Sequence, residues 1–193
     1  MGLRPFSRFG ARLLSIFFLA GCTRDAVSPV EPTAAIPSSP NSALLGLVPV
    51  RGVTRAHPLA RDISVSAVIG KTGGTISIPE AGLTLVVPAG AVSQNTNFTA
   101  TAIAGTLVAY EFEPHGTTFA VPLQFTQDLR KTSLLGVLTA PLMDGAYFTD
   151  RSKLNSAAGV AFVSELRPVV TNLLKGQASF PIDHFSGYLI SWH

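Results

Sequence analysis

The sequence predicts an all-β fold, an antiparallel β-sandwich or partly open barrel, and three observations support this prediction. Many short apolar runs alternate with polar residues, as in half-buried strands. The 17 glycines and 14 prolines indicate frequent turns. No window carries an apolar stripe of helical period over three turns. With 193 residues, the chain has room for one domain and its tails.

The clearest alternation lies in the first part of the predicted domain. Three strands are predicted there: residues 63–69, 75–78 and 83–87. Ile76 and Ile78 share one face because successive side chains of a strand point to opposite sides. Gly73 and Gly74 suit the turn before the second strand, since glycine readily adopts positive φ. This part therefore predicts three short strands joined by tight turns.

The alternation continues through the middle of the chain. Three further strands are predicted: residues 98–103, 107–112 and 118–126. The first two would form a hairpin around residues 104–106. In the third, we expect Val121, Leu123 and Phe125 to point inward. Pro122 has no N–H to donate, which favours an edge strand or a strand start.

Beyond Asp128 the alternation is weaker. The strand candidates are residues 134–139, 146–149, 160–164, 169–174, 178–182 and 188–192. Turns are predicted at residues 143–145 and 155–159. Trp192 is the only tryptophan, and we expect it to close the core near the end of the chain.

The start of the chain has the character of an export signal. Arg4, Arg8 and Arg12 give it positive charge, and the apolar run LLSIFFLA follows at residues 13–20. This run is shorter than the about 20 residues that a transmembrane helix needs. It has the length of the apolar region of a secretory signal peptide.

The tetrapeptide Leu19-Ala20-Gly21-Cys22 resembles the lipobox of bacterial lipoproteins. The resemblance implies diacylglycerol transfer to the Cys22 thiol, cleavage between Gly21 and Cys22, and acylation of the new amino group, for example with palmitate. Two or three acyl chains would anchor the protein stably. Cys22 is the only cysteine, so no disulfide competes for it. An ordinary signal peptide with an incidental cysteine is the alternative.

Three regions are predicted from this reading. Residues 1–21 form the signal peptide, residues 22–62 the lipidated cysteine with a flexible Pro/Ser/Ala-rich tether, and residues 63–193 the β-domain. The apolar stretch at residues 43–50 (ALLGLVPV) is an exception within the tether, and it could dock on the domain or add an edge strand. Thr23, where an Asp would favour the inner membrane, mildly favours the outer membrane.

The domain resembles the ZU-five domain, the module shared by ankyrins, netrin receptors of the uncoordinated type and zonula occludens proteins. The resemblance rests on residues 73–76, 82–91, 110–119, Pro122 and residues 184–188. It extends over about residues 68–190. It implies an all-β, sandwich-shaped domain of the kind used for protein contacts. The matching positions are turn glycines and apolar core residues, so no binding residue carries over.

The tripeptide His184-Phe185-Ser186 resembles the self-cleavage site of some death-domain relatives with ZU-five modules. The resemblance implies that Ser186 is the nucleophile, His184 the base and Phe185–Ser186 the scissile bond. The freed piece, residues 186–193, could stay as a paired strand. In the alternative interpretation, His184 and Ser186 cap a turn while Phe185 fills the core.

Other chemistry finds little support in the sequence. His57, His115, His184 and His193 lack the spacing of metal ligands, so we expect no metal site. Removing the three leader arginines from the 14 basic residues leaves 11, equal to the 11 acidic residues. This balance predicts no nucleic-acid binding. Hydrolase and P-loop motifs are absent from the sequence, so we expect neither an enzyme nor a cofactor other than the lipid on Cys22.

The sequence therefore predicts a lipoprotein anchored in the cell membrane or the outer membrane, with its domain facing the periplasm or the exterior. The non-catalytic domain would contact an envelope protein or serve a structural role. One alternative is an autoproteolytic module cut between Phe185 and Ser186. Another is a carbohydrate- or surface-binding adhesin domain.

Overall fold

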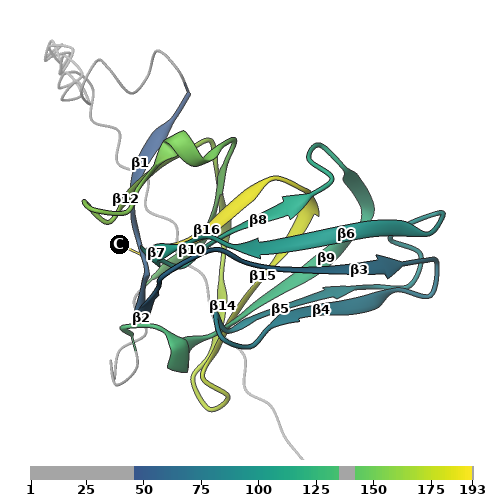
Figure 1. Cartoon of the computed structure of the whole chain (residues 1–193), viewed down its shortest axis with the longest axis horizontal. Coiled ribbons are helices and arrows are strands. Elements are labelled where there is room, and N and C mark those ends of the chain that lie inside the picture. The colour runs from purple at the N-terminus through teal and green to yellow at the C-terminus, as the bar shows by residue number, and fades with distance from the viewer. Residues whose placement is uncertain (1–45, 135–141, 193) are drawn as a thin grey trace, which may run out of the picture. The chain divides into compact units, whose positions relative to one another are not determined.

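The computed structural model describes residues 46–134 and 142–192, and the regular elements in this part are strands and two short 3₁₀ helices (Figure 1). All strand pairs are antiparallel. The predicted all-β, antiparallel fold class is confirmed. None of the helices in the described ranges is both long and apolar enough to cross a bilayer.

The strands form two main sheets and a separate pair. The large sheet contains β1 (Val48–Gly52), β3 (Ile63–Ile69), β6 (Thr96–Ala102), β8 (Ala109–Glu113), β10 (Met143–Phe148), β11 (Leu154–Asn155), β12 (Val160–Val163), β13 (Glu165–Pro168) and β16 (Gly187–Trp192). The small sheet contains β14 (Val170–Asn172), β15 (Gln177–His184), β9 (Thr118–Asp128), β5 (Leu83–Val87) and β4 (Gly74–Ile78), in that order. The separate pair is β2 (Thr54–Leu59) with β7 (Gly105–Leu107), and the helices are η1 (Leu129–Lys131) and η2 (Arg151–Lys153).

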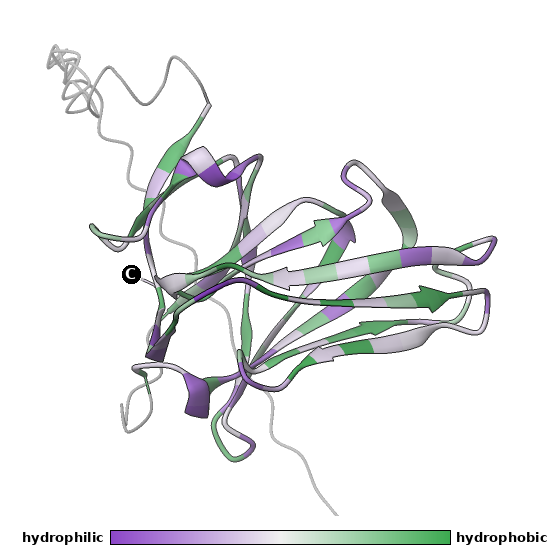
Figure 2. Ribbon diagram, in the orientation of Figure 1, coloured by the Kyte–Doolittle hydropathy of each residue, from purple (hydrophilic) through white to green (hydrophobic). Residues whose placement is uncertain are grey.

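The main core lies between the two sheets, as in a β-sandwich. Hydrophobic and hydrophilic residues alternate along several strands, as β4 and β6 show, so one face of these strands packs on this core (Figure 2). Buried side chains come from both sheets, among them Ile76, Leu85, Phe125 and Phe180 of the small sheet and Phe98, Tyr110, Phe112 and Tyr188 of the large sheet. Phe125 and Phe180 are directly paired across β9 and β15, and their rings stack with centroids 4.5 Å apart.

A second, smaller core lies inside a closed ring of strands. β12 pairs with β1, β1 with β16, β16 with β10, and β10 with β13, which continues β12. We call these five strands the strand ring. Its buried residues include Ala146, Phe148, Ala161, Val163 and Leu189.

The structure corrects the predicted start of the domain. Residues 48–59 form β1 and β2, so the prediction of a flexible tether through Asp62 is wrong there. β1 is not an edge strand either, because it pairs with β12 on one side and with β16 on the other. Residues 43–45, and the rest of the chain that precedes them, lie outside the described residues.

A buried arginine holds β2 in place. Arg55 is 5% exposed, and its guanidinium donates to the backbone oxygens of Ala81 (3.2 Å) and Ala109 (3.2 Å). It also lies over the Tyr110 ring, 5.1 Å from the ring centroid. The Tyr110 hydroxyl donates to Gln127 Oε1 at 2.6 Å and is within hydrogen-bond distance of the Ala81 oxygen, at 2.8 Å. Burial raises the pKa of Tyr110, which keeps this hydroxyl a donor.

Smaller corrections concern strand ends and exposure. Residues 143–145, predicted as a turn, begin β10, and Gly145 packs directly under the Phe180 ring. Val121 points outward, because the β9–β15 register shifts between Ile182 and His184. Pro122 lies in this irregular stretch of an interior strand. The missing N–H of the proline therefore leaves no regular strand pair without its donor.

The hairpin predicted from residues 98–103 and 107–112 is partly correct. β6 pairs with β8 from Thr99↔Glu113 to Ala102↔Tyr110, while the link between them forms β7. Of the strand predicted at 134–139, residues 135–139 lie outside the described residues. Trp192 does not close the core, because 39% of it is exposed.

Candidate functional site

The predicted cleavage dipeptide forms the link between β15 and β16. The Phe185 ring is buried, and the Phe98 and Phe119 rings lie edge-on to it with centroids 4.9 Å away in each case. The Phe185 N–H donates to Thr117 O at 2.8 Å, and the Phe185 carbonyl accepts from the Gly116 N–H at 3.0 Å. Both peptide groups of Phe185 are therefore fixed against the loop between β8 and β9.

The Ser186 hydroxyl is beside a different histidine from the one predicted. Ser186 is 5% exposed, and its Oγ donates to Thr149 O at 3.3 Å. His115 Nδ1 lies 3.4 Å from the same Oγ. Three groups thus converge on the Phe185–Ser186 bond: a hydroxyl, an imidazole nitrogen and the Gly116 N–H on the carbonyl oxygen.

His184 is turned toward another group of residues. Its Nε2 lies 3.3 Å from Glu165 Oε1, and its Nδ1 lies 3.3 Å from the Tyr188 hydroxyl. The Tyr147 ring contacts it edge-on with centroids 4.6 Å apart. The His184 ring nitrogens face Glu165 and Tyr188, while Ser186 Oγ faces His115 and Thr149, so the geometry does not fit the predicted role of His184 as the base.

The residues around His184 form a compact ionic cluster. Arg167 Nη2 donates to Glu165 Oε2 at 2.9 Å and to Asp183 Oδ1 at 2.7 Å. The Tyr188 hydroxyl donates to the His184 backbone oxygen at 3.0 Å, and burial raises the pKa of Tyr188. Within residues 46–134 and 142–192, no group of three histidine, cysteine or acidic side chains is arranged to hold a metal ion. These contacts connect β13 to β15, so a structural role explains the cluster.

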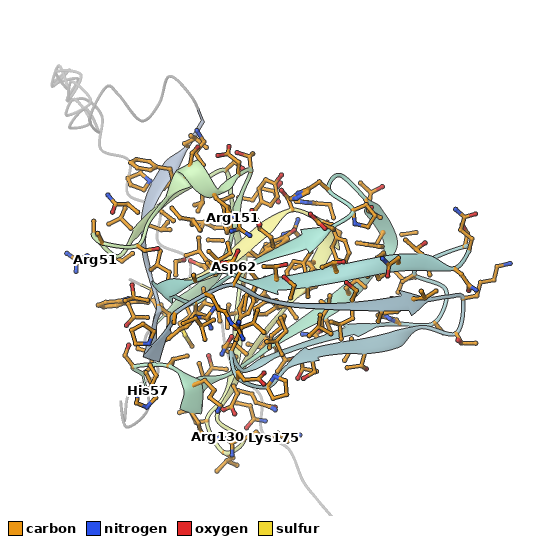
Figure 3. All side chains as sticks on the ribbon, viewed as in Figure 1. Arg51, His57, Asp62, Arg130, Arg151 and Lys175 are labelled. Atoms are coloured by element: carbon orange, nitrogen blue, oxygen red, sulfur yellow. The ribbon has the colours of Figure 1, made fainter. Side chains whose placement is uncertain are left out.

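A second candidate surface surrounds Arg51 and Trp192. These residues are directly opposite each other in β1 and β16, and both line two adjoining hollows of about 380 Å³ and about 180 Å³. Val48 and Leu166 lie in the wall of the larger hollow with 50% and 46% of their surface exposed. Figure 3 shows the Arg51 side chain extending away from the ribbon.

The pleat of β1 adds an exposed aromatic ring to this surface. Pro49 is directly opposite Phe162 in β12, as Arg51 is opposite Trp192 in β16. Directly paired residues share a face, and so do residues two apart in one strand. Pro49, Arg51, Phe162 and Trp192 therefore lie on one face of the strand ring, which we call the β1 surface.

Sequence reasoning missed the β1 surface because β1 was assigned to the tether. The one available signal was the alternation of Val48 and Val50 within residues 43–50. The predicted lipidation and cleavage residues, Gly21 and Cys22, lie outside the described residues.

Comparison with known families identifies a ZU5 domain at residues 65–106, from β3 into β7. The search of curated proteins finds no match. The matched residues contain β4, β5 and β6 together with most of β3 and the start of β7. Neither the β1 surface nor the Phe185–Ser186 link lies within them, so the family match supports the fold and assigns no role to these sites.

Proposed function

We propose that this chain is an exported lipoprotein, anchored through Cys22, whose ZU5-containing β-domain binds an envelope protein through the β1 surface. The domain is non-catalytic in this role and needs no cofactor beyond the lipid. The observation that carries the proposal is the directly paired, exposed Arg51 and Trp192, which line two hollows. Tryptophan and arginine are the side chains most enriched among residues that dominate binding energy at protein interfaces.

The composition of the surface supports a protein ligand. Phe162 and Trp192 of the β1 surface are 43% and 39% exposed, the adjoining hollow adds the exposed apolar residues Val48 and Leu166, and Arg51 adds a cation beside Trp192. An apolar centre with one guanidinium fits the core of a protein interface, where most other charged residues are depleted. A carbohydrate ligand is the second possibility for the same rings, and the experiment below distinguishes it.

The partner is tested by site-specific crosslinking in the full-length, membrane-anchored protein. A photoreactive residue replaces Trp192 in one variant and Val68, which is 69% exposed on β3, in a matched control. We expect a discrete protein adduct at position 192 that is absent at position 68 and lost when Arg51→Glu is added. A glycan adduct would support the adhesin alternative, and no adduct or equal adducts at both positions would contradict the proposal.

The anchor is tested separately. Palmitate incorporation and membrane fractionation should be lost in Cys22→Ala and reduced by globomycin. Unchanged fractionation in both cases would contradict lipidation while leaving the crosslinking result unaffected.

Self-cleavage at Phe185–Ser186 is a second candidate, favoured by the convergence of His115, Gly116 and Ser186. In the proposed reaction, Ser186 Oγ attacks the Phe185 carbonyl carbon and its proton passes to His115 Nδ1. The C–N bond breaks as that proton moves to the Ser186 nitrogen, which leaves an ester. Water then hydrolyses the ester to a Phe185 carboxylate and a free Ser186 hydroxyl. The Gly116 N–H, which donates to the carbonyl oxygen at 3.0 Å, would stabilise its negative charge.

A further inference from the structure

The turn between β14 and β15 exposes two adjacent leucines. Leu174 is 102% exposed, so nothing in the described structure covers it, and Leu173 is 57% exposed. Val170, at the start of β14, adds a third exposed apolar residue at 69%. Single exposed apolar residues are ordinary, but a group of them on a projecting turn marks an interaction site. We call Leu173 and Leu174 the leucine tip.

The turn that carries the leucine tip is firmly built. Asn172 Oδ1 accepts from the Lys175 N–H at 3.0 Å, and the Gly176 N–H donates to Leu173 O at 3.2 Å. Gly176 has φ +63°, as the last residue of such a turn requires, and its oxygen accepts from the Leu129 N–H at 2.7 Å. These hydrogen bonds, two between backbone groups and one to the Asn172 side chain, hold the turn that carries the leucines.

Basic side chains surround the leucine tip. Lys175 follows Leu174 in the turn, and Arg130 of η1 packs beside Gly176. Figure 3 shows Arg130 and Lys175 close together at this end of the molecule, and Figure 2 shows hydrophobic and hydrophilic colour in the same loop. Lys131 is also exposed on η1. Asp128, at the end of β9, is bound by Arg130 at 2.9 Å and is therefore not the partner of the Lys175 ammonium.

We propose that the leucine tip inserts into the headgroup region of an anionic lipid bilayer while Arg130, Lys131 and Lys175 contact lipid phosphates. Apolar side chains rimmed by basic residues are the pattern of peripheral membrane contacts, in which the apolar part enters the boundary between headgroups and acyl chains. Each basic residue close to an anionic surface adds attraction. This pattern is better matched by a lipid surface than by a protein groove, because the tip projects instead of forming a cavity.

The contact goes beyond the proposed function and does not depend on lipidation of Cys22. The two are compatible, because the chain between Cys22 and Gly46 could reach about 80–86 Å when fully extended. If both occur, the lipid and the leucine tip would hold the domain in one orientation at the membrane.

The test measures the depth of individual side chains in the full-length protein. Cys22→Ser gives a cysteine-free background, since Cys22 is the only cysteine. A nitroxide is attached at Leu174→Cys or, as a matched control, at Val68→Cys, which is 69% exposed on β3. Vesicles contain equal parts phosphatidylcholine and phosphatidylglycerol, or phosphatidylcholine alone. The ratio of oxygen to nickel-chelate collision rates reports whether each label is in lipid or water.

We expect this ratio to rise several-fold at position 174 on anionic vesicles and to stay aqueous at position 68. Leu173→Glu should abolish the rise, and Lys175→Glu should reduce it without unfolding, because both positions are exposed. An aqueous label at position 174, or an equal rise at position 68, would overturn the proposal. Spin–spin broadening at position 174 without vesicles would overturn it as well, since that result would show a second copy of the chain at the tip.

Discussion

His115 Nδ1 lies 3.4 Å from Ser186 Oγ, whereas His184, close to Ser186 in sequence, turns its ring to Tyr188 and Glu165. The contact joins residues 71 positions apart and depends on how the β8–β9 loop folds against the β15–β16 link. The chemistry of this link therefore belongs to a tertiary arrangement, and the tripeptide alone does not contain it.

The first prediction concerns the base for self-cleavage. His115→Gln should slow cleavage by about 100-fold or more, which is the usual effect of losing a general base. His184→Gln should leave the rate nearly unchanged, because its ring does not contact Ser186. Intact mass over several days measures the fragments, and Ser186→Ala is the uncleaved reference. A wild-type chain that stays a single species would end the hypothesis, and a strong effect of His184→Gln alone would reassign the base.

The second prediction concerns Gly187, the first residue of β16. A Cβ at this position would overlap the Phe148 ring, so Gly187→Ala forces the ring or the strand to move. We expect a loss of about 1–3 kcal/mol in the free energy of unfolding, the usual cost of overpacking. Urea denaturation measures it. Phe148→Leu should recover part of the loss in the double variant, and strictly additive effects would show that the two side chains do not compete for space.

The sequence predicted best where partners are close along the chain. β4 and β5 combine clear alternation with a short turn between them, and Gly73 and Gly82 adopt positive φ, at +77° and +80°. β3 shows the same alternation but pairs with β6 in the large sheet, so its partner did not follow from its position beside β4 in the sequence. β1 was missed because its partners lie in β12 and β16, far along the chain. Its prolines and serine-rich surroundings suit a linker equally well, so only tertiary pairing decides between strand and tether.

The candidate sites were predictable to a smaller extent for the same reason. Phe185 and Ser186 were identified, and the buried Phe185 ring agrees with the interpretation of a core residue. The position of His115 depends on how the β8–β9 loop folds, and the β1 surface depends on the pairing of the strand ring. Neither can be read from the sequence alone. The exposure of Trp192 could not be inferred, because tryptophan is usually well buried. Only its pairing with Arg51 places it on the exposed β1 surface.

The third prediction concerns the buried guanidinium of Arg55. Arg55→Met keeps much of the apolar stem but removes the donors to the Ala81 and Ala109 oxygens. We expect a loss of about 2–4 kcal/mol in the free energy of unfolding, because charge-assisted buried hydrogen bonds disappear. Chemical denaturation measures it, with the exposed Arg61→Met as the control. Equal stability of both variants would show that the Arg55 contacts are replaceable.

The fourth prediction concerns the start of the domain. A chain that begins at Gly46 should keep the native fold, while one that begins at Ile63 should lose it, because β1 closes the strand ring and β2 carries Arg55. Near-ultraviolet circular dichroism and the cooperativity of thermal unfolding distinguish the two. A cooperative, native-like chain starting at Ile63 would contradict this assignment and restore the predicted boundary.

The last prediction concerns pH and the ion pair of Asp62. Asp62 accepts from the Ala104 N–H at 2.7 Å and from Arg151 at 2.6 Å, and Arg151 also binds Glu111 at 2.6 Å. Figure 3 shows Asp62 and Arg151 close together. The Ala104 hydrogen bond, followed by that from Arg151, lowers the pKa of Asp62 below its ordinary value of 3.8.

A carboxyl with a lowered folded-state pKa stabilises the fold above its unfolded-state pKa, and this contribution is lost as the pH falls through the folded-state value. Asp62→Asn should therefore cost stability at neutral pH, by no more than about 1 kcal/mol because the pair is partly exposed. The difference between the two proteins should narrow only below about pH 4, the ordinary range of an aspartate. Urea denaturation across pH 2–7 measures this difference. A constant difference over the whole range would mean that Asp62 acts through its shape and hydrogen bonds, with no contribution from its charge.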